Sequence, residues 1–207
     1  TGHSSAVGVA KNQPAKLAAI EAHYDSLAPG DLYLFGWVDT ESEKVYGISL
    51  PGMLSYLIHG DVNAPIRGLR SFDKKDLPNI AFVFQTYHLM VGIGFLLIGM
   101  SIYAVFLLWK KKLFTTTWYL KLLVPSVLLP QIANQVGWYT AEAGRQPWIV
   151  YGLLRTSDGL SKSVSAGQIL FSLILFTLIY ALLLVLFIYL LDQKIKHGPE
   201  EVSDSHH

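Results

Sequence analysis

Three long apolar stretches constrain the fold of this chain more than any other feature of its 207 residues. They run from about Ile80 to Trp109, from about Trp118 to Tyr139 and from about Ala166 to Leu191. Each is longer than the roughly 20 residues that a helix needs to cross ~30 Å of hydrocarbon. Because 52% of the residues are hydrophobic and gather in blocks instead of alternating, we predict an all-α membrane protein with three transmembrane helices and a preceding outer loop domain.

Basic residues around these stretches predict the orientation of the chain. Lys110–Lys112 follow the first stretch, and Lys194 and Lys196 follow the third. The positive-inside rule places both clusters in the cytoplasm. We therefore expect a multi-pass protein of the bacterial plasma membrane, with residues 1–77 extracytoplasmic and the C-terminus cytoplasmic.

These limits divide the chain into seven segments. In order, we expect an extracytoplasmic loop region over 1–77, a transmembrane helix over 78–109, a cytoplasmic loop over 110–117, a transmembrane helix with a polar stripe over 118–146, an outer loop over 147–163, a transmembrane helix over 164–192 and a cytoplasmic tail over 193–207. Within the outer region, helical spacing predicts a short amphipathic helix over 15–24. Residues 48–60 are too short to span the bilayer and are expected to lie at its surface.

Composition excludes several classes of protein. A net charge of +1 with no basic face excludes a nucleic-acid binder. The absence of cysteine excludes a disulfide framework and a thiolate metal site. Because the chain begins at Thr1 without a leader pattern, we expect it to be a processed product or the C-terminal part of a longer protein.

A polar stripe runs along the second apolar stretch. Gln131, Gln135, Trp138, Glu142 and Arg145 follow one another at spacings of four, three, four and three residues, which places them on one helical face. Ionisable groups in membrane helices are costly and are functional by default. Two interpretations stay open: a Glu142–Arg145 pair that anchors the helix end at the outer surface, or a cofactor or proton site there.

Two other positions are candidates for chemistry. Met90 shares a helical face with Gly94, and a thioether beside a glycine suits a low-spin haem iron, although ordinary packing explains most methionines equally well. Lys16 and Glu21 lie five residues apart and do not share a face, so a solvated helix surface is the alternative there.

Three stretches resemble one family. GWYTAEAGRQPWIVYGLLRT (137–156) resembles the GW-x-x-x-E-x-GRQPW block of subunit I of cytochrome bd-type quinol oxidases. KLAAIEA (16–22) is similar to the quinol-binding loop of that family, and HLMVGIGFLL (88–97) to its haem-ligating helix. The resemblance implies the C-terminal half of a subunit I with a short quinol loop.

The resemblance also implies roles for single residues. Met90 would be an axial ligand of the low-spin haem b, and Glu142 would ligate one of two high-spin haems, which of the two being left open. Trp138 and Arg145 match positions beside those haems. His88 stands where many members carry an arginine near the low-spin haem, and this departure leaves the role of His88 open.

Lys16 and Glu21 match loop residues that act in quinol oxidation. Lys16 would hydrogen-bond a quinol oxygen, and Glu21 would accept a quinol proton. The implied enzyme is a quinol:oxygen oxidoreductase that oxidises quinol at the outer face, reduces oxygen to water and builds proton motive force without pumping. The alternatives are a proton- or ion-conducting transporter with Glu142 as its relay, a structural subunit without cofactor, and a cyanide-insensitive oxidase that holds haem b alone.

The resemblance further implies cofactors and partners. The cofactors would be a low-spin haem b, a high-spin haem b and a haem d, with haem b in place of haem d left open. The partners would be the N-terminal half of the same subunit, subunit II, small single-helix subunits, oxygen, a membrane quinol, for which menaquinol is the expectation, and the lipid bilayer.

Overall fold

The computed structural model describes residues 2–161 and 163–198, in two compact units, Thr1–Gly159 and Leu160–His207. The elements of the first unit are α1 (Gly2–Asn12), α2 (Pro14–Glu21), β1 (Leu32–Asp39), β2 (Lys44–Leu50), α3 (Met53–His59), the 3₁₀ turns η1 (Leu69–Ser71) and η2 (Lys74–Asp76), α4 (Ile80–Trp109), α5 (Thr117–Ser126), α6 (Leu129–Ala143), β3 (Trp148–Val150) and β4 (Leu154–Arg155). The second unit contains α7 (Ala166–His197). The fold is mostly helical, and the two short antiparallel hairpins β1–β2 and β3–β4 correct the all-α expectation.

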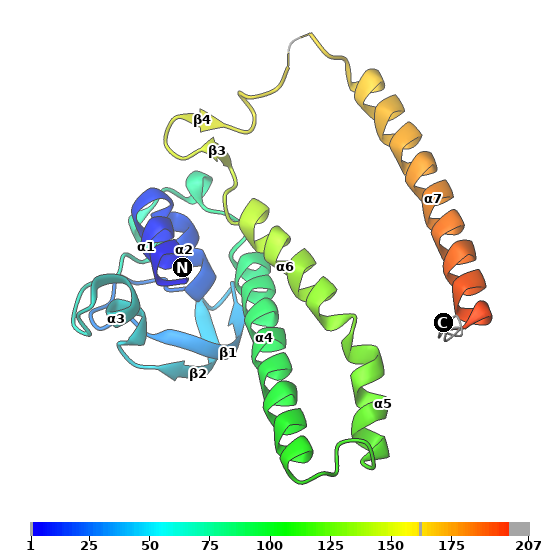
Figure 1. Ribbon diagram of the computed structural model, residues 1–207. Coiled ribbons are helices and arrows are strands. Elements are labelled where there is room, and N and C mark those ends of the chain that lie inside the picture. Colours follow the sequence, from blue (N-terminus) through cyan, green and yellow to red (C-terminus); the bar gives the residue numbers. More distant parts are fainter. Residues whose placement is uncertain (1, 162, 199–207) are drawn as a thin grey trace, which may run out of the picture. The chain divides into compact units, whose positions relative to one another are not determined.

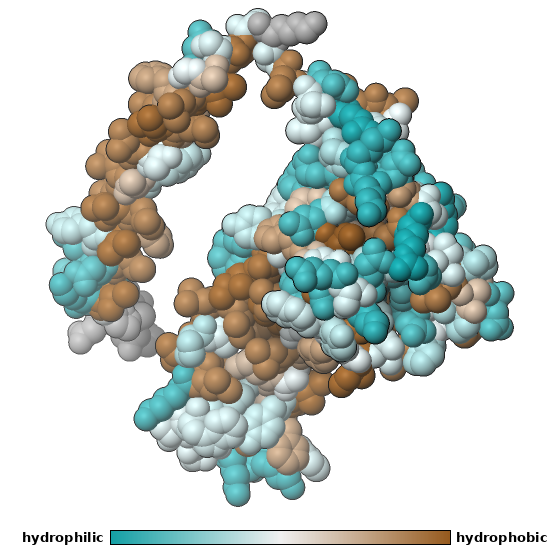
Figure 2. Space-filling view, turned by 180° about the vertical axis from the view of Figure 1, so that it is seen from behind, coloured by the Kyte–Doolittle hydropathy of each residue, from teal (hydrophilic) through white to brown (hydrophobic). Residues whose placement is uncertain are grey.

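The first and third apolar stretches form the long helices α4 and α7. The Asn79 side chain caps α4 by accepting a hydrogen bond of 3.1 Å from the backbone N–H of Phe82. Ser165 and Gln168 form a capping box at the start of α7. Among the described residues, these two helices have the length and apolar character that a membrane crossing requires. Hydrophobic side chains cover most of α7, none of whose residues is buried within the chain (Figure 2).

The second apolar stretch differs from the single helix expected over 118–146. It forms α5, of 10 residues, and α6, of 15 residues, with a break around Val127 and Leu128. Pro125 and Pro130 lack the N–H group that a continuous helix would need at those positions. Neither helix alone reaches the length of a span, so a third crossing by α5 and α6 together stays a prediction.

The region before α4 is more structured than the sequence indicates. The helix expected over 15–24 is α2, which ends at Glu21 because Ala22 adopts a left-handed conformation (φ 49°). The interfacial segment expected over 48–60 contains the end of β2 and the helix α3. Both α1 and the hairpin β1–β2 were missed. From residue 199 onward, the expected cytoplasmic tail lies outside the described residues.

A small hydrophobic core joins α2, β1 and α4. Ala18 and Ala19 of α2 are almost fully buried and lie in one cluster with Val83 and Phe84 of α4. Alanine leaves room for close packing between helices, so α2 is held directly against α4. Val38 of β1 completes the cluster, and Figure 1 shows β1 and β2 beside the first half of α4, with α6 running along α4 as well.

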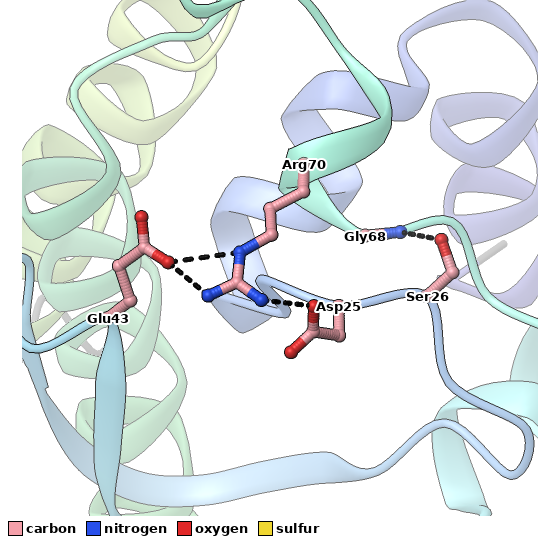
Figure 3. Close-up of polar contacts among 5 residues, drawn as sticks. All are labelled: Asp25, Ser26, Glu43, Gly68 and Arg70. Carbon is pink, nitrogen blue, oxygen red and sulfur yellow. Dashed lines mark hydrogen bonds and ion pairs between the residues drawn. The ribbon is translucent and has the colours of Figure 1, made fainter.

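Two sets of polar contacts connect the loops that precede α4 (Figure 3). The Arg70 guanidinium lies 2.5 Å from Asp25 and 2.5 Å from Glu43, which is in the turn of the β1–β2 hairpin. Nearby, the Gly68 N–H donates to the Ser26 hydroxyl over 3.1 Å. Each exposed ion pair contributes little alone, but the shared arginine joins three segments that are distant in sequence.

The packing of α4 on α6 depends on small and hydroxyl side chains. The Thr140 hydroxyl donates to the Thr86 hydroxyl over 2.8 Å, and both residues are buried. A Cβ atom on Gly137 would lie 2.8 Å from the Met90 sulfur. Glycine at this position therefore lets the Met90 side chain rest directly on the α6 backbone.

We predict that Gly47→Ala destabilises the hairpin strongly. A Cβ atom on Gly47 would lie 2.1 Å from the Phe35 carbonyl oxygen, so the paired strands would have to separate. Overpacking of this kind costs about 1–3 kcal/mol. Thermal unfolding of the assembled protein should show a lower midpoint for Gly47→Ala. The control Gly8→Ala places its methyl group in open space on α1 and should not lower the midpoint, because alanine favours a helix more than glycine does. Equal midpoints for the two variants would contradict the prediction.

Candidate functional site

A cavity of about 340 Å³ lies where α1, α2, β1, α3 and α4 meet. Its walls are mainly aliphatic, with Leu17 and Ile20 from α2 and Leu54 from α3. Two of the sequence-predicted residues, Glu21 and Met90, line it together. A pocket of this size and character fits an apolar ring with a few polar substituents.

Glu21 is the carboxyl among the residues that line this cavity. It is the last residue of α2 and is 1% exposed. One carboxylate oxygen, Oε2, accepts a hydrogen bond of 3.0 Å from the backbone N–H of Tyr33. Burial raises the pKa of Glu21 to about 7 from its usual value near 4.5, and the hydrogen bond from Tyr33 opposes this only in part. Glu21 can therefore exchange a proton near neutral pH.

Met90 supplies a soft sulfur ligand to the same cavity. It lies in the first half of α4, next to Gly137 of α6. Tyr87 precedes it by three residues, so the two side chains share a helical face and both line the cavity. This spacing could have identified Tyr87 from the sequence, whereas the contact of Met90 with Gly137 could not have been found that way.

Lys16 occupies a different position from Glu21. Its ammonium donates a hydrogen bond of 3.2 Å to the Ala141 carbonyl near the end of α6. Its aliphatic stem packs against Gly144, where a Cβ atom would lie 3.1 Å from two of its carbons. Burial lowers the pKa of the Lys16 ammonium, the Arg145 guanidinium lowers it further, and Glu142 opposes both effects. The structure thus brings Lys16 to the Glu142–Arg145 pair and away from Glu21.

The polar stripe lies on the free face of α6. Glu142 pairs with Arg145, which follows the end of the helix, and Trp138 is 59% exposed. Gln131 and Gln135 are exposed as well, whereas the opposite face, which carries Thr140, packs on α4. A carboxylate, a cation and an aromatic ring are therefore available to a group outside the described chain.

His88 turns away from the cavity that Met90 lines. It is 5% exposed, stacks on Phe84 with ring centroids 3.9 Å apart, and lies with its two ring nitrogens 2.9 Å and 3.0 Å from the carbonyl oxygens of Phe84 and Tyr33. Its contacts join α4 to β1. The sequence did not indicate this role of Tyr33, whose backbone N–H contacts Glu21 and whose carbonyl oxygen contacts His88.

The donor set fits the haem ligands that the sequence predicts. A thioether at Met90 and a carboxylate at Glu142 are single ligands on separate helices, and both side chains have an accessible side. Among residues 2–161 and 163–198, no group of three or more histidine, cysteine, aspartate or glutamate side chains could hold a bare metal ion. Each iron would therefore need its other contacts from the porphyrin and from elsewhere.

Comparison with known proteins gives a consistent result. The family model described as cytochrome bd terminal oxidase subunit I matches residues 1–199. Cytochrome bd ubiquinol oxidase subunit 1 of Bacillus subtilis is 34% identical over all of this chain and 46% of its own length. Cytochrome bd-II ubiquinol oxidase subunit 1 of Escherichia coli is 25% identical over 96% of this chain and 51% of its own length.

A solved structure agrees with these matches. The structure of bd oxidase from Geobacillus thermodenitrificans has a TM-score of 0.76 and 32% identity, over 96% of this chain and 45% of the other. The chain therefore spans about half the length of the relatives that it matches.

We predict that Glu21 makes stability depend on pH. The pKa of Glu21 in the folded state, about 7, lies above the ordinary value of 4.5. The protonated carboxyl therefore contributes fully to the free energy of unfolding below pH 4.5, and this contribution is lost as the pH rises through 7. The shift corresponds to a loss on the order of 3 kcal/mol. Unfolding temperatures measured across this range should fall for the parent protein and stay flatter for Glu21→Gln.

The matched control is Glu41→Gln, which replaces an exposed carboxylate in the hairpin turn. It should retain the pH dependence of the parent protein. A Glu21→Gln variant with the same pH profile as the parent would overturn the assignment.

Proposed function

The chain belongs to the cytochrome bd terminal oxidase subunit I family, and from this premise we propose that it forms the C-terminal half of a subunit I that oxidises quinol in a bacterial membrane. The observation that carries the proposal is that Glu21 and Met90 line one cavity. Quinol oxidation releases protons and electrons together, so a proton acceptor and an electron acceptor must both lie close to the quinol ring. Glu21 would serve the first role, and Met90 would hold the iron for the second.

The residues around Glu21 suit proton transfer. The aliphatic side chains of Leu17 and Ile20 keep the carboxyl out of water, which sets its pKa at about 7. The N–H of Tyr33 fixes one carboxylate oxygen, so the other, Oε1, is available to a quinol hydroxyl. Lys16 is held by the Ala141 carbonyl, and a contact with quinol requires its ammonium to leave that oxygen.

Met90 and Glu142 would be the haem ligands of this half. Bound haem would supply one-electron redox chemistry at Met90 and oxygen reduction to water near Glu142. Arg145 balances the charge of Glu142, and Trp138 offers an apolar flat surface beside it. A low-spin haem b, a high-spin haem b and a haem d form the proposed set.

The proposed topology follows from the lysines after α4. With Lys110–Lys112 in the cytoplasm, α2 and its Glu21 face outward. Protons from quinol are then released outside, and protons for water formation are taken from inside, so membrane potential builds without a pump. The remainder of subunit I, subunit II, small single-helix subunits and menaquinol are the proposed partners.

We predict that Met90→Leu removes the low-spin haem signature. Leucine preserves the apolar volume but has no sulfur to ligate iron. The reduced-minus-oxidised optical spectrum of the purified oxidase should lose its low-spin haem bands. Met100→Leu, on the same helix α4, should leave them intact. An unchanged spectrum for Met90→Leu would sink the assignment.

We also predict that Glu21→Gln separates quinol oxidation from oxygen reduction. Loss of a general base slows such steps by roughly 100-fold or more, so quinol-driven oxygen consumption should fall by that order. Oxygen consumption driven by an artificial donor that bypasses the quinol cavity should stay near the parent rate. Glu41→Gln should leave both rates unchanged. A parallel fall in both rates for Glu21→Gln would contradict the proposed division.

Other functions give different results in the same preparation. A transporter with Glu142 as its relay would show ion flux without oxygen consumption, and a structural subunit would show no haem bands. A cyanide-insensitive oxidase with haem b alone would lack the absorption bands of haem d.

A further inference from the structure

One face of the β1–β2 hairpin carries large apolar side chains that the described residues leave more than half exposed. Strand register pairs Phe35 with Ile48 and Trp37 with Tyr46, and partners in such pairs point to the same side of the sheet. All four side chains are more than half exposed, at 56%, 65%, 67% and 61% respectively. The next pair toward the turn is Asp39 with Lys44, so the face changes from apolar to charged along the strands.

Contacts of the opposite face with α4 determine the orientation of the hairpin. Val38 is 4% exposed and belongs to the core cluster with Val83 and Phe84 of α4. The Gln85 side chain donates to the Gly36 carbonyl over 3.3 Å. Because residues alternate between the two sides of a strand, contact of this face with α4 directs Trp37 and Tyr46 outward.

The hairpin also has a defined depth along α4. Thr40, in the turn, lines a pocket with Pro78 and Ile80, at the beginning of the helix. Midway along β1, the Phe35 ring comes within 3.5 Å of the position that a Cβ on Gly92 would occupy. The charged end of the hairpin thus lies beside the first turn of α4, and the apolar end lies about three turns further along.

Counting along α4 relates this depth to the bilayer. The helix ends at Trp109, just before Lys110–Lys112. Roughly 20 residues cross the hydrocarbon, so its outer boundary falls near Met90. Gly92, beside Phe35, is therefore at that boundary. Phe35 also lines a groove with Leu89 of α4, which joins the hairpin face to the apolar surface of the helix.

We propose that this hairpin face, formed by Phe35, Trp37, Tyr46 and Ile48, lies in the outer lipid–water interface of the membrane. Its order of side chains follows the polarity of the bilayer from water inward: a charged pair, an aromatic pair, then an apolar pair. Tryptophan and tyrosine favour the headgroup region, where an apolar ring and a polar tip are both accommodated. The occupant of this surface is phospholipid; the inference rests on the proposed membrane orientation of α4 and not on the quinol chemistry.

Spin labels on three hairpin positions test the proposal in the assembled oxidase, reconstituted in phosphatidylglycerol–phosphatidylethanolamine vesicles. The chain contains no cysteine, so each introduced cysteine is its only labelling site in this chain. Ile48→Cys reports on the outward face, Val45→Cys on the face toward α4, and Ser42→Cys on the turn. Collisions with oxygen, which concentrates in lipid, are compared with collisions with a water-soluble nickel chelate.

The label at position 48 should collide with oxygen several-fold more often than with nickel, whereas the label at position 42 should show the reverse preference. The label at position 45 should be protected from both. A label at 48 that behaves like that at 42 would mean a hydrated face, and one that behaves like that at 45 would mean a face covered by protein; either result overturns the proposal. Tyr46→Cys repeats the measurement on the same face if Ile48→Cys does not assemble.

Discussion

The packing of α2 against α4 is the contact on which the rest of the site depends. Ala18 and Ala19 bring the two helices together over Val83 and Phe84, and no larger side chain would allow so close an approach. The end of α2 is thereby placed near Tyr87 and Met90 of α4. A carboxyl from α2 and a thioether from α4 then share one mainly apolar cavity, although they are far apart in sequence.

Apolar packing also sets the chemistry of the carboxyl. Within the described part of the chain, Glu21 accepts one hydrogen bond, from the Tyr33 N–H, and it is almost fully buried, so its charged form is poorly stabilised. A group of this kind exchanges protons near neutral pH without a metal ion or a partner acid beside it. By contrast, Glu142 is exposed and paired with Arg145.

Local sequence signals predicted some of this arrangement and could not predict the rest. Apolar length and flanking charge located α4 and α7, because these signals act within one helix. Pro125 and Pro130 are visible in the sequence, but whether neighbouring helices keep the segment continuous depends on contacts that the sequence does not encode locally. The β1–β2 hairpin was missed because its outward face is apolar, which removes the alternation that identifies a surface strand.

The site residues divide in the same way. The spacing of KLAAIEA indicated that Lys16 and Glu21 do not share a face. In the structure Lys16 donates to the Ala141 carbonyl of α6, whereas Glu21 lines the cavity. The resemblance left the role of His88 open, and in the structure its ring nitrogens lie beside the carbonyl oxygens of Phe84 and Tyr33, so that it joins α4 to β1. Backbone partners such as the Tyr33 N–H leave no pattern in the sequence.

The short helix α2 contacts two parts of the site, since Lys16 near its start donates to a carbonyl at the end of α6 and Glu21 at its end lines the cavity. Any displacement of these eight residues would disturb both contacts at once, so the position of α2 links the cavity to the end of α6 that carries Glu142.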